Sequence, residues 1–273
     1  MRRVRSVPVI HRVRTRILPA AGLAALMALP AGCGGTPPRP AAAGGSPTTS
    51  PAPAAGLPES TTHTTVRGAP RDLTPTYVTD GLVVHPSTPA RVLDAPGGRP
   101  IATLPTTQLG SPTWVPVVDR SGGWYQVLLP SKPNHATGWI PSAQAGLRTA
   151  RTPYLVRVDV TRRRLALYRS GRPVGRWSVA VGGARTPTPA GRTFLLALLR
   201  PARPEPSPLL IPLGVHSATL DTFGGGPGTV ALHGWPDRSV FGRAISHGCV
   251  RVPEDALRAL SRVPLGTLVL ITG

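Results

Sequence analysis

The chain has 273 residues and a formal net charge of +20, from 31 Lys and Arg against 11 Asp and Glu. This length allows one large domain, or two small domains with tails. Hydrophobic residues make up 40% and charged residues 15%, which provides for a core and excludes a long coiled coil. The two cysteines, Cys33 and Cys249, exclude a disulfide scaffold and a zinc site built on several thiolates.

The basic residues are dispersed along the sequence. Lys132 is the only lysine, and the densest short cluster beyond the N-terminus is 162–164. A nucleic-acid-binding protein typically gathers basic and aromatic residues on one face or carries a recognisable motif, and neither pattern is found. We therefore expect no nucleic-acid partner. The positive charge suits an anionic surface such as a membrane or cell wall, and the alternative is an ordinary solvated surface.

The first 32 residues have the pattern of an export signal. Six arginines and no acid occupy 1–16, and an apolar run at 17–31 is short for a membrane span of roughly 20 residues. The following 29–35, Leu-Pro-Ala-Gly-Cys-Gly-Gly, resembles a bacterial lipobox, which implies lipidation of Cys33. We expect an exported protein anchored to the outer face of the cytoplasmic membrane, in the cell wall. The alternative is an ordinary signal peptide with an incidental Cys33.

Residues 33–72 have the composition of a linker. They are almost entirely Ala, Pro, Gly, Ser and Thr. Such a segment buries too little apolar surface to offset its ordering entropy, and its prolines keep it extended. We predict a disordered spacer over this range.

Short β-rich runs alternate with Gly, Pro and Asp turns in 73–148, which predicts a small β-barrel. The later runs, 123–127 and 137–141, resemble the last strands of a bacterial Src-homology-three-like domain. That resemblance implies binding of wall peptides. The alternative is a rigid spacer whose core is filled by Trp124 and Trp139. The predicted strands are 91–93, 101–104, 113–118, 124–129 and 138–140.

The C-terminal part, 152–273, is predicted to be mainly β with one short helix. The helix begins at 253–255, where a proline and two acids suit a first turn, and ends before Pro264 and Gly266. The whole chain is thus expected to be a small β-barrel domain followed by a β-rich domain. The strands of this second domain are predicted at 156–160, 165–168, 174–181, 194–199, 229–232 and 268–271 by alternation or by apolar runs.

The reactive residues of this domain are Cys249, His233 and His247. A lone cysteine with histidines nearby is a candidate nucleophile. A histidine within hydrogen-bonding reach can remove the thiol proton, and the resulting ion pair would lower the thiol pKa toward or below neutral. The other imidazole nitrogen needs an acceptor, for which a backbone carbonyl must serve. Gly248 allows close backbone approach, and adjacent amides could form an oxyanion hole. The alternatives are an inert buried cysteine and a zinc site made of these three side chains.

The segment from about 152 to 273 resembles an L,D-transpeptidase catalytic domain of the YkuD type. The string Ser-His-Gly-Cys-Val-Arg at 246–251 is very specific, and His233 lies 16 residues before Cys249, as the family pattern expects. The resemblance covers essentially the whole domain in the right order. Its other matching pieces are 165–168, 179–182, 188–191, 232–234 and 266–271.

The resemblance implies a role for each site residue. Cys249 would be the nucleophile and His233 the general base, oriented by the carbonyl of Gly234. Backbone amides at Gly248 and Cys249 would hold the oxyanion. The remaining residues would shape the site or contact the substrate: His247 would orient, and Ser246 and Arg251 would bind substrate.

The same resemblance implies the reaction. Cys249 would attack a peptidoglycan tetrapeptide stem, release the terminal D-alanine and pass the thioester to a neighbouring stem, giving a 3→3 cross-link. No cofactor or metal is expected, and we expect a monomer. The proline-rich region 193–233 would supply the substrate lid, as a rigid loop. Two alternatives stay open: an L,D-carboxypeptidase that hydrolyses tetrapeptide stems, and a non-catalytic wall-binding lipoprotein.

Overall fold

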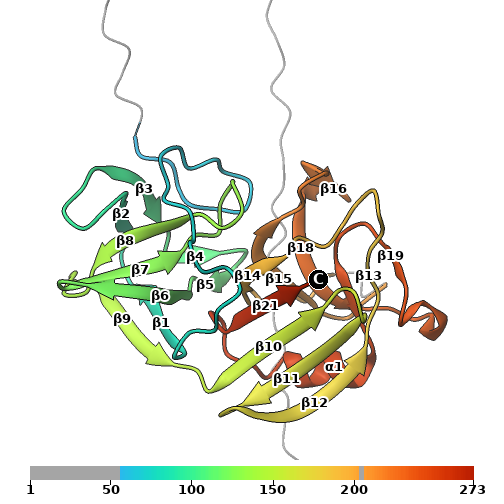
Figure 1. The fold of residues 1–273 in the computed structure, drawn as a ribbon. Coiled ribbons are helices and arrows are strands. Elements are labelled where there is room, and N and C mark those ends of the chain that lie inside the picture. Colours follow the sequence, from blue (N-terminus) through green and yellow to red (C-terminus); the bar gives the residue numbers. More distant parts are fainter. Residues whose placement is uncertain (1–55, 203–205) are drawn as a thin grey trace, which may run out of the picture. The chain divides into compact units, whose positions relative to one another are not determined.

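The computed structural model of the chain describes residues 56–202 and 206–273. The predicted signal peptide, Cys33 and most of the predicted linker lie outside these residues. Within them, no helix combines the length and apolar character that a membrane crossing needs. The fold is mainly β with one short α-helix, which confirms the predicted fold class (Figure 1).

The first domain is built on a seven-stranded sheet in which every neighbouring pair is antiparallel. Between the third and the sixth strand along the chain, β4 (Thr107–Gln108) and β5 (Ser111–Pro112) pair as a separate two-stranded ladder. The core contains Val84, Val92 and Ile140, each fully buried. The sheet has, in spatial order, β3 (Pro100–Leu104), β2 (Ala90–Leu93), β8 (Thr137–Pro141), β7 (Trp124–Leu128), β6 (Val115–Ser121), β1 (Leu82–Pro86) and β9 (Leu147–Arg151).

β1 and β9 of this sheet were not predicted. β9 pairs with β1 along its whole length, so the sheet extends to Arg151, beyond the end of the predicted barrel at 148. Four of the five residues of β9 are exposed, and this edge strand therefore lacks the apolar alternation that marks a half-buried strand. The likeness to a Src-homology-three-like domain stays a prediction.

The predicted linker is wrong over its last part, because residues 57–72 pack on the first domain. Val66 is 1% exposed and belongs to the core of that domain. Backbone bridges join Glu59 to Thr103, Thr65 to Lys132 and Arg71 to Ala136. Backbone pairing and a few buried side chains hold a segment whose composition alone predicts disorder.

The second domain contains a five-stranded and a three-stranded sheet. β10 (Tyr154–Asp159) pairs antiparallel with β11 (Arg164–Arg169) and parallel with β21 (Leu268–Thr272), so the last strand of the chain lies beside the first strand of the domain (Figure 1). The larger sheet has β12 (Arg172–Ser178), β11 (Arg164–Arg169), β10 (Tyr154–Asp159), β21 (Leu268–Thr272) and β14 (Gly191–Phe194). The smaller has β15 (Leu210–His216), β18 (Thr229–Gly234) and β20 (Val250–Val252).

The remaining elements are short. The helix α1 (Glu254–Leu260) follows β20, and its buried face of Ala256, Leu257 and Leu260 packs into the core shared by the two sheets. A single 3-10 turn spans Arg238–Val240. Two short ladders complete the domain: β13 (Val181–Gly182) with β19 (Ala244–Ser246), and β16 (Thr222–Phe223) with β17 (Gly226–Pro227).

Three predictions differ from the structure in this domain. The strand expected at 174–181 ends at Ser178, and Val181–Gly182 turns away to pair with β19. The strand expected at 194–199 is instead β14, which begins at Gly191 and ends at Phe194. The lid region, expected as a rigid loop, contains the strand β15 and the hairpin β16–β17. Here tertiary pairing prevails over the turn-forming Pro and Gly of the local sequence.

Candidate active site

The loop 246–249 carries the thiol between β19 and β20. Ser246 is 3% exposed, and its hydroxyl donates to the carbonyl of Cys249 at 2.5 Å while accepting from the Gly248 amide at 3.2 Å. Gly248 has φ +113°, a conformation that favours glycine. Ser246 thus holds the turn together from inside. Its predicted substrate contact stays a prediction, and the bonds of the buried hydroxyl lie within the loop itself.

A second loop, 182–188, supports the thiol loop from outside. Thr188 donates its hydroxyl to the carbonyl of Gly248 at 2.9 Å, and Thr186 donates to the carbonyl of Ser246 at 3.0 Å. A side chain at Gly182 would collide with the backbone of Thr186 and Thr188, so this position requires glycine. The two loops together fix the backbone on both sides of Cys249.

His233 lies near the end of β18, next to the strand that follows the thiol. Parallel pairing sets His233 opposite Arg251 and Leu232 opposite Val250. The Nδ1 of His233 lies 2.8 Å from the carbonyl oxygen of Gly234. Because a carbonyl can only accept, Nδ1 carries the hydrogen, and the neutral ring keeps a free lone pair on Nε2. His233 therefore has the tautomer that a general base needs.

Trp235 lies between His233 and Arg251. The indole ring of Trp235 is edge-on to the imidazole of His233, with 5.9 Å between the ring centroids. The guanidinium of Arg251 stacks over the indole ring, 3.6 Å from its centroid. The Nε of Arg251 is buried and has no hydrogen-bond partner. Arg251 thus holds a partly desolvated positive charge beside the candidate base and thiol.

Burial and nearby charge shift the pKa of both reactive groups of the site. Burial raises the pKa of the Cys249 thiol above its ordinary value, against smaller opposing effects of the Ala231 backbone and the Arg251 charge. Burial also lowers the pKa of His233, partly offset by its bond to Gly234, and the Arg251 charge lowers it further. Both shifts favour a neutral thiol and a neutral imidazole in the resting site. Cys249 is partly buried, and its sequence pattern gave no indication of this burial.

His247 is exposed, and its ring lies 5.2 Å from that of Phe223. No group of three or more His, Cys, Asp or Glu side chains in 56–202 and 206–273 comes together in a way that could hold a metal ion. The alternative zinc site of His233, His247 and Cys249 is thus not formed. A small pocket at the thiol is lined by Ser217, Leu220, Phe223, Gly228, Thr229, Val230, His247 and Cys249.

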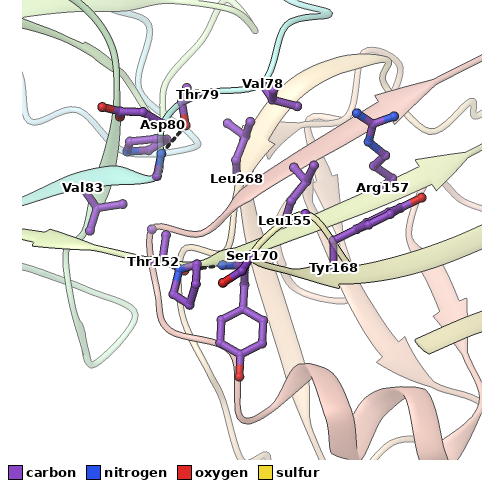
Figure 2. Close-up of a pocket in the computed structure, with 16 residues that line it drawn as sticks. Val78, Thr79, Asp80, Val83, Thr152, Leu155, Arg157, Tyr168, Ser170 and Leu268 are labelled. Atoms are coloured by element: carbon purple, nitrogen blue, oxygen red, sulfur yellow. Dashed lines mark hydrogen bonds between the residues drawn. The ribbon is translucent and has the colours of Figure 1, made fainter. Parts of the chain in front are cut away.

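A larger cleft of about 480 Å³ lies elsewhere, between the first sheet and β10–β11. Figure 2 shows Val78, Asp80 and Val83 on one side and Leu155 and Tyr168 on the other. It contains neither the thiol nor any of the predicted site residues. Chemistry, and not size, therefore identifies the small pocket at Cys249 as the candidate active site.

The family model described as "YkuD: L,D-transpeptidase catalytic domain" matches residues 153–271. A putative L,D-transpeptidase YkuD of Bacillus licheniformis is 33% identical over 153 residues, which cover 54% of this chain and 86% of that relative. The chain belongs to the YkuD L,D-transpeptidase family. A second relative of the same description, from Bacillus subtilis, is 28% identical over 48% of this chain and 80% of its own.

Among solved structures, an L,D-transpeptidase from Mycobacterium smegmatis matches 58% of this chain and 82% of its own, with 17% identity and a TM-score of 0.38. The family region begins at 153, directly after β9. All residues predicted for the YkuD site lie within it. The seven-stranded sheet of the first domain lies outside it.

Sequence reasoning missed three residues that shape this YkuD site. Trp235 follows His233 and Gly234 directly, and its aromatic ring beside a histidine was the available signal. Thr188 lay in a matched family piece without an assigned role. Ser207, 1% exposed, accepts from the Gly234 amide at 2.8 Å, and nothing in its proline-rich surroundings marks it.

Proposed function

We propose that the chain is a peptidoglycan L,D-transpeptidase that forms 3→3 cross-links through a thioester on Cys249. The observation that carries this proposal is the His233 imidazole, fixed by Gly234 with its Nε2 free, on the strand beside the thiol loop. An exposed or randomly oriented histidine would not provide this preorganised base. Family membership supplies the reaction class, and the site supplies the groups that perform it.

In the first half-reaction, His233 Nε2 takes the thiol proton as sulfur attacks the carbonyl of the third residue of the stem. A C–S bond forms and negative charge develops on oxygen. The Gly248 amide exchanges its long contact with Ser246 for this oxyanion, together with the Cys249 amide. The C–N bond then breaks, and the imidazolium returns the proton to the amine of the leaving D-alanine.

In the second half-reaction, the side-chain amine of a neighbouring stem attacks the thioester. His233 accepts a proton from this amine, a new amide bond forms, and the C–S bond breaks. The proton returns to sulfur, and the resting neutral pair is restored. Attack by water in place of the amine would give an L,D-carboxypeptidase.

Arg251 favours the charged state of sulfur during this cycle. Its charge lowers the pKa of both Cys249 and His233, so it stabilises the thiolate and disfavours an early imidazolium. Arg251 thus acts through the local electric field, and we propose substrate binding for its unpaired Nε. We further propose export and a lipid anchor at Cys33, which would place the site where stem peptides occur.

The test uses the full chain carrying Cys33→Ser, so that Cys249 is the only thiol. The protein is incubated with a purified disaccharide-tetrapeptide, and mass spectrometry reads the products. A cross-linked dimer lacking one D-alanine supports the proposal. Tripeptide alone favours the carboxypeptidase. An unchanged substrate, together with no labelling of Cys249 by a carbapenem, favours the non-catalytic wall-binding protein.

A further inference from the structure

The hairpin β16–β17 covers the thiol pocket. Thr222 pairs with Pro227 and Phe223 with Gly226 across a two-residue turn. Gly224 and Gly225, with φ of 60° and 82°, form this turn as hairpins of this kind require. Phe223 lies on the face toward the pocket, where its ring contacts that of His247. A two-stranded hairpin is marginally stable by itself, so its position over the thiol depends on what holds its base.

The first domain holds one side of that base through a single asparagine. The side-chain amide of Asn134 donates to the carbonyl of His216 at 2.7 Å, and its oxygen accepts from the His216 amide at 2.9 Å. His216 ends β15, the edge strand of the smaller sheet, just where the register with β18 shifts. The Asn134 side chain thus forms the two hydrogen bonds with the His216 backbone that a neighbouring strand would otherwise form.

Two further contacts from the first domain surround the hairpin. Lys132 lies 2.7 Å from the carboxylate of Asp221, directly before β16. Thr62 shares a hydrogen bond of 2.5 Å with Thr229, directly after the hairpin. The backbone of Lys132 is itself paired with Thr64 and Val66. The packed segment 57–72 therefore supports the loop that holds the hairpin.

The two faces of the hairpin point to different parts of the molecule, one toward the supporting contacts and the other toward the thiol pocket. Thr222 and Pro227 form one face and line a groove of about 580 Å³ with Lys132 and Asp221. Phe223 is on the opposite face, toward Cys249. A displacement on the face held by the first domain therefore moves the face that covers the thiol.

We propose that Asn134 and Lys132 are positioning residues, through which the first domain holds the hairpin over Cys249. The part of this proposal that concerns turnover rests on the proposed function. The part that concerns covering of the thiol does not. Asn134 is the stronger of the two, because its two bonds are part-buried, whereas the Asp221 side chain is 88% exposed.

The test measures the rate at which iodoacetamide alkylates Cys249 in the full chain carrying Cys33→Ser. We expect Asn134→Ala to raise this rate about 5- to 10-fold, as the loss of one or two hydrogen bonds would predict. Lys132→Ala should raise it about twofold, and Lys132→Arg should restore it. Arg120→Ala is the matched control, because it removes a similar surface pair with Asp80 within the first domain.

The same variants are then assayed with the disaccharide-tetrapeptide. We expect kcat/KM to fall in Asn134→Ala while the thiol reacts faster with the small reagent. Because general unfolding would give the same two changes, both rates are measured at a temperature well below the thermal transition of the variant. If Asn134→Ala does not fold, Asp221→Ala tests the second support of the hairpin, the pair of Lys132 and Asp221, from its exposed side. Unchanged alkylation in every folded variant overturns the proposal. An inert wild type overturns the proposed function and leaves the alkylation test standing.

Discussion

Within residues 56–202 and 206–273, two clusters of partly or fully buried ionisable groups are built in opposite ways. Arg192 on β14 and Asp72 form a buried ion pair, with side chains 3% and 2% exposed and two bonds of 2.6 and 2.7 Å. Arg192 also donates to Tyr77 and Thr74. The second cluster, Cys249, His233 and Arg251, leaves a guanidinium nitrogen without a partner and holds the thiol and imidazole neutral.

The difference indicates what each cluster is for. In the Arg192 cluster, bidentate geometry and additional acceptors compensate the desolvation of both charges. That cluster joins the segment 57–72 to the second domain. The Cys249 cluster is left incompletely bonded, and such polar groups are free to meet a substrate and its developing charge. One cluster should therefore control stability and the other reactivity.

The sharpest contrast comes from Cys249→Ala. We expect no turnover of the disaccharide-tetrapeptide, because no other described side chain lies in position to form the thioester. The free energy of unfolding should change by less than about 1 kcal/mol, since the thiol makes no ion pair. Product analysis and urea denaturation check the two parts. Turnover at the wild-type rate in Cys249→Ala would show that Cys249 is not the nucleophile.

His233→Ala should have the next largest effect on activity. Loss of the general base is expected to lower kcat by about 10² to 10⁴-fold, with the thiol left in place. His247→Ala is the comparison variant, because that exposed ring also lines the thiol pocket and lies against Phe223. If His247→Ala lowered kcat as much as His233→Ala, the assignment of the base would be wrong.

The converse experiment is Arg192→Met. We expect the free energy of unfolding to fall by about 3–5 kcal/mol, because Asp72 would be left buried without its partner. Arg120→Met, which breaks an exposed pair with Asp80, should cost less than about 1 kcal/mol. Thermal and urea denaturation measure both. Equal losses in the two variants would mean that burial of the Arg192 pair contributes nothing.

The residues of the Cys249 cluster could be named from the sequence and those of the Arg192 cluster could not, for a physical reason. The residues 246–251 form one local string, and the 16-residue spacing to His233 belongs to the family pattern. Asp72 and Arg192 are 120 residues apart, and neither belongs to a motif. A long-range ion pair leaves no local periodicity, so composition assigned residues 57–72 to a linker.

The strands show the same limit. β10 and β11 alternate buried and exposed side chains and were predicted from that pattern. β15 follows a proline-rich stretch and contains Pro212, and only its pairing with β18 makes it a strand. The pKa directions at the site were equally out of reach, because they depend on burial and on where Arg251 stacks.

The pH dependence of Cys249 alkylation tests the neutral resting pair. Iodoacetamide reacts with the thiolate, so the rate should rise about tenfold per pH unit from pH 6 to 8 and keep rising beyond. A thiolate–imidazolium pair would instead give a plateau near neutral pH.

Since the folded chain holds the pKa of His233 below 6.5, the unfolded chain binds that proton more readily. Stability should therefore fall as the pH drops below about 6.5.

Arg251→Met sharpens that profile. Removing its charge should raise the pKa of both Cys249 and His233, and so slow alkylation at a fixed pH. Arg258→Met removes an exposed charge that pairs with Glu254 on α1 and should leave the profile unchanged. A faster reaction in Arg251→Met would mean that Arg251 shields the thiol more than it stabilises the thiolate.

Ser246→Ala carries the smallest expected effect and joins the two clusters in one test. Its buried hydroxyl forms hydrogen bonds with the backbone of Cys249 and Gly248, so it is fully bonded like the buried Arg192 pair. It nevertheless lies within the reactive loop. We expect a loss of about 1–2 kcal/mol in the free energy of unfolding. Ser239→Ala, at an exposed turn, is the control. If Ser246→Ala lowers kcat without lowering stability, the hydroxyl acts on the reaction and not on the turn, and the division between a stabilising and a reactive cluster fails at this residue.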